Sequence, residues 1–446
     1  MPRLSLAMIT KNEARCLAHC LESVRGLVDE VVVVDTGSSD DTVAIAERSG
    51  ARVGRFAWCD DFSAARNESL RLCTGDWVLV LDADEAVDAL DHGKIRRALD
   101  SEGTSGHRAP QGYLLTSRNY LVDPAGRIFD QQAVPNRSPY QEGAQFPFYV
   151  DGPVFRLFRR FPDLRFEGRI HERADPYLVR RRLPIAVLDA VLHHYGKLEP
   201  AAEQAKKTYY LDLAERDAAD RPGDADCQFF VMTQADLLGL WDKAIKAGSA
   251  VMRLQPQHVP YAVLITVARA HQELGHHREA LTLLLKVLKA EPGHPMAVQR
   301  LLASLYALGR AEEARPHLDR ARAAHPQDPL PWLLLGELEE RCGRLPEARV
   351  ALQGAVERSP GEPGLRQALI QLDLRLGLEA QAAADALEAL RVLPDQGAGH
   401  WHALAAGYLL KCGHVQPGRA VLDLGLRNFP EHVGLVRLAA ALKGSS

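Results

Sequence analysis

The sequence predicts two kinds of fold in one chain, an α/β domain first and an all-α solenoid of helical repeats behind it. Over residues 1–100 apolar runs alternate with amphipathic helical patterns, and beyond residue 225 glycine and proline recur at a nearly constant interval. The length of 446 residues suffices for several domains. Apolar residues make up 46% and charged residues 25%, which is an ordinary globular composition.

The first hundred residues are expected to form strands and helices in alternation. Short apolar runs predict strands at 4–9, 31–34 and 77–81, and a further strand is expected at 52–56. The second of these runs is apolar throughout, as a strand of a parallel sheet requires when helices cover both of its faces. We therefore expect a parallel sheet with helices on both sides.

Helices are expected between these strands and after the last one. The predicted spans between strands are 12–24, 40–48 and 62–73. In the first, Leu17, Leu21 and Val24 share one face. The third is expected to begin with Ser63 as its cap and to stop before Gly75.

The second half is punctuated with a period close to 34 residues. Glycine recurs at positions 239, 275, 309, 343, 377 and 413, and proline at 256, 292, 326, 360, 394 and 430. Glycine suits the left-handed turn that ends the first helix of a repeat, and proline closes the second helix. We expect six helix pairs over about 225–432 and a capping helix over 432–443. The predicted segments are an α/β domain at 1–198, a connecting helix at 199–224 and a repeat domain at 225–446.

The charge balance argues against a nucleic-acid partner. Lysine and arginine number 54 against 58 aspartates and glutamates, a formal net charge of −4, whereas general nucleic-acid binding depends on a basic surface. The apolar runs are also far shorter than the roughly 20 residues that span a bilayer. We expect a cytoplasmic protein with no transmembrane segment.

Polar side chains gather where the predicted strands end. They are Thr10, Asn12, Glu13, Asp35, Thr36, Asp82 and Asp84. In open parallel sheets, ligands bind beyond the carboxyl ends of the strands. Carboxylates gathered there repel one another unless a hard cation such as Mg²⁺ or Mn²⁺ joins them, and such a cation can bridge a diphosphate and stabilise its charge as it leaves. The chain has neither a GxGxxG after the first strand nor a P-loop, which disfavours dinucleotide and ATP chemistry of those kinds.

Several segments resemble a known family. LSLAMITKNE, EVVVVDTGSSDDT, FSAARNESLRLCTGDW and VLVLDADE are similar, in order and spacing, to the catalytic domain of inverting family-two glycosyltransferases, which has the GT-A fold. VFRLFRR, LRFEGRIHE and LHHYG are similar to the branch in which tetratricopeptide (TPR) repeats follow the transferase domain, and the period near 34 resembles that repeat. The resemblance covers nearly the whole chain.

The resemblance implies a divalent cation, Mn²⁺ or Mg²⁺, and a set of residues around it. Asp84 would be the principal metal ligand, and Asp82 would meet the ribose or reach the metal through water. His194 would complete the coordination, with His193 as its close rival. The residues implied to bind the nucleotide-sugar are Thr10, Asn12, Glu13, Asp35, Thr36, Arg66, Asn67 and Asp82. Thr36 stands where many relatives have an acidic residue, so the contact with the base is expected to differ.

An inverting transfer needs a general base that takes the proton of the acceptor. We expect Glu172 in this role, and Glu167 and Asp151 stay open as alternatives. Arg156 and Arg159 are expected on one side of a strand and receive no catalytic role.

The leading hypothesis is a metal-dependent inverting glycosyltransferase of the hexosyltransferase type. It would use a nucleotide-diphosphate sugar, expected to be UDP-linked. The acceptor would be a peptide or protein held by the repeats, or a cell-surface glycan, and such repeats also mediate protein contacts or homodimerisation. The alternative is a catalytically degenerate nucleotide-sugar-binding domain whose repeats serve as a scaffold for protein–protein interaction.

Overall fold

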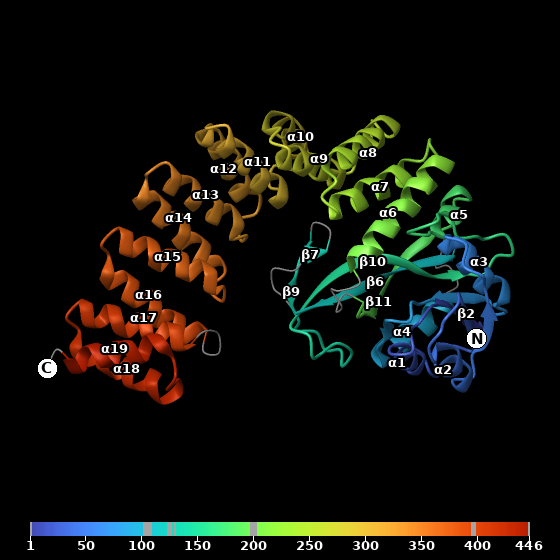
Figure 1. Ribbon diagram of the computed structural model, residues 1–446, viewed down its shortest axis with the longest axis horizontal. Helices are drawn as coiled ribbons and strands as arrows, with labels where there is room; N and C mark the ends of the chain where they lie inside the picture. The colour runs from blue at the N-terminus through green and yellow to red at the C-terminus, as the bar shows by residue number, and fades with distance from the viewer. Residues whose placement is uncertain are drawn as a thin grey trace. The chain divides into compact units, whose positions relative to one another are not determined.

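The computed structural model describes residues 2–100, 109–122, 127–128, 131–196, 203–393 and 398–444 (Figure 1). Residue contacts divide the chain into two compact units, Met1–Val259 and Pro260–Ser446. The first unit therefore holds the predicted first repeat together with the α/β domain. The predicted boundary at 198/199 lies outside the described residues, and the boundary at 224/225 stays a prediction.

One half of the central sheet in the first unit is parallel and contains the predicted strands. These are β1 (Leu4–Thr10), β2 (Glu30–Asp35), β3 (Arg52–Arg55) and β4 (Trp77–Val80). They pair in parallel in the order β3-β2-β1-β4, so their carboxyl ends meet at one edge. The predicted fold class, an α/β domain followed by helical repeats, is confirmed.

The other half of the sheet is mainly antiparallel, and of its strands the sequence indicated only the one that carries Arg156 and Arg159. Its strands are β5 (Glu85–Val87), β6 (Gly112–Leu121), β10 (Phe148–Arg159) and β11 (Ile185–His194). β10 joins this half to β4, and β5 pairs with the end of β11 so that His194 lies opposite Glu85. This register brings the segment between β4 and β5, which contains Asp82 and Asp84, next to the end of β11. The short strand β9 (Val134–Pro135) pairs with β10, and β7 (Arg127–Ile128) pairs with β8 (Gln131–Gln132).

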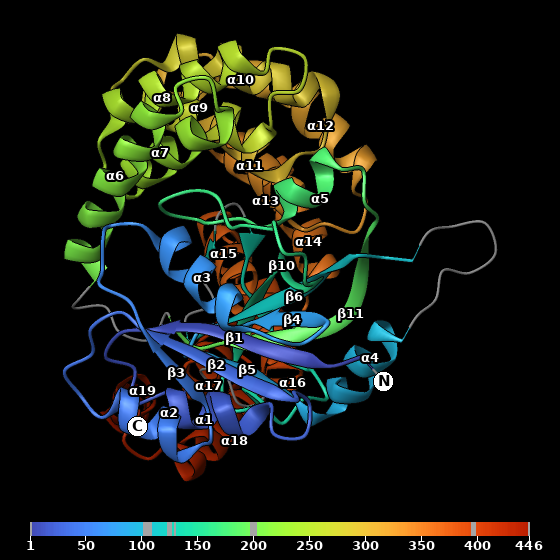
Figure 2. The ribbon, with the colours of Figure 1, turned by 90° about the vertical axis from the view of Figure 1, so that its right-hand side faces the viewer.

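Helices cover both faces of the sheet. Along β1, Leu4, Leu6 and Met8 point into one core while Ala7 points into the other, as the two-residue period of a strand requires. The first core packs against α1 (Leu17–Ser23), α2 (Thr42–Arg48) and α4 (Ala89–Leu99). The second packs against α3 (Phe62–Leu72) and α5 (Asp175–Arg180). Figure 2 shows α3 on one side of the sheet and α1 and α2 on the other.

The predicted helices differ from the observed ones at their starts. The helix predicted from residue 12 begins at Leu17, because Asn12 has a left-handed backbone (φ 59°) and the chain first makes a turn at the sheet edge. The cap of α3 is Asp61, whose Oδ1 accepts from the Ala64 N–H at 2.9 Å. The prediction of Ser63 as that cap is therefore wrong, since its hydroxyl donates to the Gly168 carbonyl at 2.6 Å.

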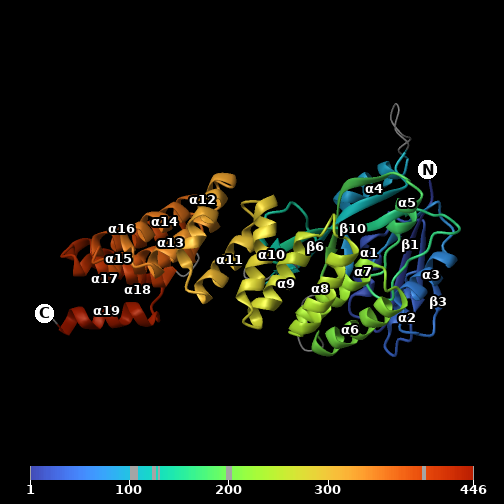
Figure 3. The ribbon, with the colours of Figure 1, turned by 90° about the horizontal axis from the view of Figure 1, so that it is seen from above.

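Helix pairs follow the sheet. The first unit ends with α6 (Glu203–Asp220), α7 (Ala225–Leu237) and α8 (Trp241–Leu254). The second unit contains α9 (Tyr261–Glu273), α10 (His277–Ala290), α11 (Pro295–Ala307), η1 (Ala311–Ala314), α12 (Arg315–Ala324), α13 (Leu330–Arg341), α14 (Leu345–Arg358), α15 (Pro363–Arg375), α16 (Glu379–Val392), α17 (Ala398–Lys411), α18 (Val415–Asn428) and α19 (Val433–Gly444). Figure 3 shows the helices of the second unit in succession along the array.

The repeating glycines occupy the turns for which they were predicted. The glycines at 239, 275, 309, 343, 377 and 413 have φ between 67° and 82°, the left-handed region that favours glycine. Each follows the first helix of a pair. The predicted repeat proline at 394 lies outside the described residues. No helix in the described part of the chain is both long and apolar enough to cross a membrane.

Candidate active site

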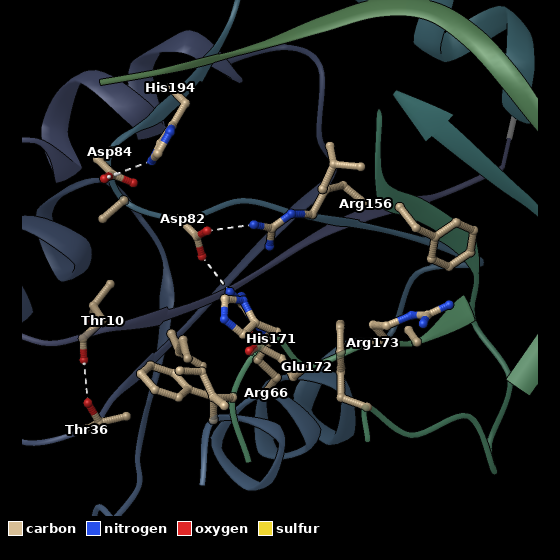
Figure 4. Close-up of a pocket in the computed structure, with 18 of the residues that line it drawn as sticks. Thr10, Thr36, Arg66, Asp82, Asp84, Arg156, His171, Glu172, Arg173 and His194 are labelled. Atoms are coloured by element: carbon tan, nitrogen blue, oxygen red, sulfur yellow. Dashed lines mark hydrogen bonds and ion pairs between the residues drawn. The ribbon is translucent and has the colours of Figure 1, made fainter. Parts of the chain in front are cut away.

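A cavity of about 680 Å³ lies at the carboxyl ends of β1, β2 and β4. The predicted site residues that line it are Thr10, Glu13, Thr36, Arg66, Asp82, Asp84, Glu172 and His194 (Figure 4). They come from six parts of the chain, and the parallel strands and the register of β5 on β11 help to bring them together. The sheet edge is thus the place where the polar side chains converge.

Three predicted binding residues hold the surrounding loops instead of lining this cavity. Asn12 Oδ1 accepts from the Ser39 N–H at 2.8 Å, and the Asp35 carboxylate accepts from the backbone that follows it. The Asn67 side chain donates to the Phe166 carbonyl at 3.1 Å and accepts from its N–H at 2.8 Å. Their predicted contacts with a nucleotide-sugar stay predictions, and the structure gives each of them a role in shaping the rim.

Asp82 lies between two arginines at the base of the cavity (Figure 4). Its Oδ1 is 2.5 Å from Arg66 Nη2, and its Oδ2 is 2.6 Å from Arg156 Nη2. Burial disfavours the charged carboxylate, but Arg156 and Arg66 outweigh it and hold the pKa of Asp82 far below its usual range. Both carboxylate oxygens of Asp82 are therefore engaged by cations of the protein.

Arg66 links Asp82 to Glu172. Its side chain is buried, and its Nε donates to Glu172 Oε1. Burial disfavours the guanidinium charge, but the two carboxylates outweigh it and raise the pKa of Arg66. Arg66 therefore fixes the position of the candidate base with a hydrogen bond between full charges, the stronger class of hydrogen bond.

Arg156 reaches this site because β10 is irregular. A β-bulge lies between Phe155 and Leu157, and the Arg156 side chain turns into the cavity while Arg159 is exposed. The prediction that the two arginines share one side of a strand is therefore wrong. Arg156 and Arg159 are three residues apart, and residues at that spacing lie on opposite faces of a regular strand.

Asp84 and His194 form a second pair in the cavity. His194 Nε2 is 3.3 Å from Asp84 Oδ2, and His194 Nδ1 is 2.8 Å from Asn119 Oδ1. Because the Asn119 amide nitrogen faces two carbonyl groups, its oxygen is the atom that faces His194, and Nδ1 must donate. Burial lowers the pKa of His194, but the hydrogen bond and charge of Asp84 raise it by more.

The neighbouring histidine points elsewhere. His193 is fully buried, and its Nδ1 is 2.7 Å from the Tyr120 hydroxyl. Burial lowers the pKa of His193 to about 4, so this ring is neutral at neutral pH. Of the two rival histidines, His194 is the one that faces Asp84.

Glu13 adds a further carboxyl group to this rim. Its pKa is raised to about 7 by burial and by the negative charges of Asp84, Asp82 and Asp40, while Lys206 lowers it. A raised carboxyl pKa in a cleft is typical of functional sites. Negative charge therefore accumulates around Asp84, whereas Asp82 is neutralised by its arginines.

Helix α6 supplies a wall of the cavity that the motifs did not indicate. Lys206 and Tyr210 line the cavity from α6, beside Trp58 and Phe62. The rings of Trp58 and Phe62 are 4.8 Å apart, and those of Phe62 and Tyr210 are 6.0 Å apart. Phe62 begins the segment FSAARNESLRLCTGDW, but Trp58, Lys206 and Tyr210 lie outside the segments that carry the family resemblance, so only the fold could identify these three.

The two alternative bases are engaged outside this cavity. Glu167 pairs with Arg180 at the protein surface. Asp151 accepts two hydrogen bonds from Arg118, at 2.8 and 2.7 Å, and lines a different cavity. Among the three candidates, Glu172 is the one that lines the cavity with Asp82 and Asp84.

Comparisons with known proteins find two families in the chain. The chain matches the model of Glycosyl transferase family 2 over residues 5–162 and that of the Tetratricopeptide repeat over residues 267–329 and 303–363. A TPR repeat-containing protein of Synechococcus elongatus is 34% identical over 50% of this chain and 50% of its own length. An uncharacterized glycosyltransferase of Rickettsia felis is 47% identical over 38% of this chain and 59% of its own length.

The chain spans between half and about three-fifths of the length of these two relatives. It covers more of an uncharacterized glycosyltransferase of Rickettsia prowazekii, which is 36% identical over 49% of this chain and 68% of its own length. The family match also covers β1 to β4 and the residues Asp82, Asp84 and Arg156 of the cavity. The chain therefore belongs to glycosyltransferase family 2 and carries tetratricopeptide repeats behind its transferase domain.

Proposed function

We propose that the protein is a divalent-cation-dependent, inverting hexosyltransferase that uses a nucleotide-diphosphate sugar, UDP-linked, as its sugar donor. The observation that carries this proposal is the convergence on one cavity of two buried arginines, the Asp84–His194 pair and Glu172. These groups supply a diphosphate site, a cation site and a base. The family membership supports the transferase activity, and the remaining assignments are our own.

We assign Arg66 and Arg156 as the residues that bind the diphosphate of the sugar donor. Arg66 Nη1, Arg156 Nε and Thr10 Oγ1 are buried and have no hydrogen-bond partner among the described residues. Buried polar atoms normally have a hydrogen-bond partner, so a group of buried donors without one in the same cavity supports the binding of a ligand that accepts hydrogen bonds there. Phosphate oxygens suit guanidinium groups.

We assign Asp84 and His194 as the protein ligands of the cation. Mg²⁺ and Mn²⁺ sites of this kind use one or two protein ligands together with phosphate oxygens of the substrate. Two protein ligands therefore suffice, although no three His, Cys, Asp or Glu side chains converge on a point within the described residues. When bound, the cation would stabilise the charge of the departing diphosphate. A direct metal contact by Asp82 stays a prediction, because it requires one of its arginine contacts to open.

We assign Glu172 as the general base that takes up the proton of the acceptor. The acceptor hydroxyl attacks the anomeric carbon from the face opposite the diphosphate, and its proton passes to Glu172. The new carbon–oxygen bond forms as the bond to the diphosphate breaks, and the nucleoside diphosphate leaves. Arg66 contacts Glu172 directly and lines the proposed diphosphate site, so one side chain orients both ends of the displacement.

The acceptor is proposed to be a peptide or protein, with a cell-surface glycan as the second candidate. Helical repeats that follow a transferase domain support an extended chain as partner, because solenoids present extended binding surfaces. Transfer to unfolded peptides, measured against transfer to oligosaccharides, separates the two.

Thermal unfolding with nucleotides tests the sugar donor. UDP, GDP, CDP and TDP are each added with and without Mn²⁺, and UDP with Mn²⁺ is expected to raise the melting temperature most. At about 100 times its dissociation constant, a ligand adds roughly 2.7 kcal/mol to the free energy of unfolding. If no nucleotide stabilises the protein under either condition, the scaffold alternative replaces the enzyme, and the repeats become the functional part.

Gly196→Ala tests the cation site without changing a ligand. A Cβ at this position would lie 2.1 Å from Asp84 Oδ2 and 2.7 Å from His194 Nε2. Because a carboxylate can swing away, we expect a nearly unchanged melting temperature but a Mn²⁺ affinity that is about 10- to 100-fold weaker, as for other changes beside metal ligands. Calorimetric titration with Mn²⁺ and nucleotide measures it. Gly223→Ala, whose Cβ would meet nothing within 4 Å, is the matched control, and equal affinities in the two variants would refute the site.

A further inference from the structure

The loop 167–173, which carries Glu172, has two sides with different neighbours. Arg169 Nη2 is 2.8 Å from Asp220 Oδ2 of α6, and Arg173 Nη1 is 2.5 Å from Asp226 Oδ2 of α7. Between these two residues, His171 also contacts α7. The odd-numbered side chains from 169 to 173 thus reach the helices behind the transferase domain. Glu172 reaches Arg66 on the opposite side.

His171 makes two contacts with α7. Its ring stacks on Phe230 with a centroid distance of 4.4 Å and an interplanar angle of 24°. Its Nε2 is 3.2 Å from Gln234 Nε2, and Gln234 is only 5% exposed. A neutral imidazole can accept this hydrogen bond from the Gln234 amide group.

The backbone at His171 explains how the two sides diverge. His171 has φ 52°, in the left-handed region, which is uncommon for residues other than glycine and in which asparagine, aspartate and histidine are enriched. With this conformation the His171 ring stacks on Phe230 of α7, and the next residue, Glu172, contacts Arg66. Both His171 and Glu172 are among the residues that line the cavity (Figure 4). Such conformations persist when the surroundings hold them in place. Here Phe230 and Gln234 supply those surroundings.

The ends of the loop are fixed to the transferase domain. Glu167 and Arg173 exchange two backbone hydrogen bonds, at 2.9 and 3.0 Å. The Phe62 N–H donates to the Arg169 carbonyl at 2.9 Å. With its ends closed in this way, the loop tip depends on α7 for the position of His171 and therefore of Glu172.

We infer that His171 is a positioning residue for Glu172, and that the first repeat helix α7 holds it through Phe230 and Gln234. The first repeat is thus part of the catalytic unit, and the repeats beyond it are those available for other partners. This inference rests on the proposed function only in the role given to Glu172. It assigns α7 a task in the reaction that a separate binding array would not have.

The kinetic test uses His171→Asn in the full chain. Asparagine tolerates the left-handed backbone but lacks the ring that stacks on Phe230. We expect kcat to fall about 10- to 100-fold, the range for small misplacement of a reacting group, with KM for the sugar donor unchanged. In a Glu172→Gln background the same change should have no further effect, because His171 acts through Glu172. An equal fall in kcat in both backgrounds, or a rise in KM without a fall in kcat, would overturn the inference.

A second test does not depend on turnover. Hydrogen exchange of the peptide that covers 167–173 is compared in wild type, Phe230→Leu and the control Phe229→Leu, which makes the same change one residue away on α7. Faster exchange only in Phe230→Leu is expected, because only Phe230 stacks on His171. Unchanged exchange in Phe230→Leu would contradict the role of α7. If wild type binds no nucleotide and transfers no sugar, the proposed function fails, and the exchange result still decides whether α7 holds the loop.

Discussion

Asp84→Asn is expected to abolish the Mn²⁺-dependent part of nucleotide binding while the fold stays intact. The substitution removes the negative charge that faces His194 Nε2 at 3.3 Å, and a hard divalent cation depends on charged oxygen ligands. Stabilisation by UDP and Mn²⁺, roughly 2.7 kcal/mol in wild type at about 100 times the dissociation constant, should fall to the value for UDP alone. Sugar transfer should fall about 10³-fold or more, because a cation at the leaving group is worth several kcal/mol.

The control for this variant is Asp189→Asn. It removes the same charge from a side chain that is 94% exposed and lies outside the cavity. Thermal unfolding with and without Mn²⁺ is measured on both variants. If Asp84→Asn still binds the nucleotide in a Mn²⁺-dependent way, Asp84 is not a ligand of the cation. A loss in both variants would mean that the effect comes from net charge and not from the site.

The parallel half of the sheet could be predicted from the sequence because β1, β2 and β4 are short, mainly apolar runs, and β3 (RVGR) follows from the alternation of strands and helices. The antiparallel half could not. β10 is only partly buried along its length and contains a bulge, so its pattern is neither a continuous apolar run nor a clean alternation. β5 has three residues. It exists because β11 pairs with it, and long-range pairing of this kind leaves no local signal.

Some residues of the site could likewise be predicted from the sequence, and others could not. Asp82 and Asp84 directly follow a predicted strand, so their place at the sheet edge could be predicted from topology alone. His171, Lys206 and Tyr210 could not be assigned, because their roles depend on how α6 and α7 pack against the transferase domain. Lys206 and Tyr210 stand in an ordinary helical pattern, and the motif LRFEGRIHE, which contains His171, gives no sign of a contact with α7. The motif residues therefore identify the chemistry, and the helices behind the domain decide where the reacting groups are held.

Glu172→Gln is expected to keep nucleotide binding and to lower kcat by about 10²–10⁴-fold, the usual contribution of a general base. The glutamine oxygen can still accept the hydrogen bond from Arg66 Nε, so the loop and the arginine should stay in place. What is lost is the ability to take up a proton. The separation of binding from turnover is therefore the specific signature of this variant, and steady-state transfer together with UDP titration measures it.

Glu167→Gln and Asp151→Asn are the matched controls, because each removes a carboxylate that is already paired with an arginine outside the cavity. Both should retain transfer within a few-fold of wild type, since neither side chain can reach an acceptor bound beside Asp84. If Glu172→Gln retains activity and one of the controls loses it, that residue is the base and the cavity must rearrange on binding. If all three retain activity, the base lies elsewhere, and Glu13, with a pKa near 7, is the carboxyl group in the cavity to test next.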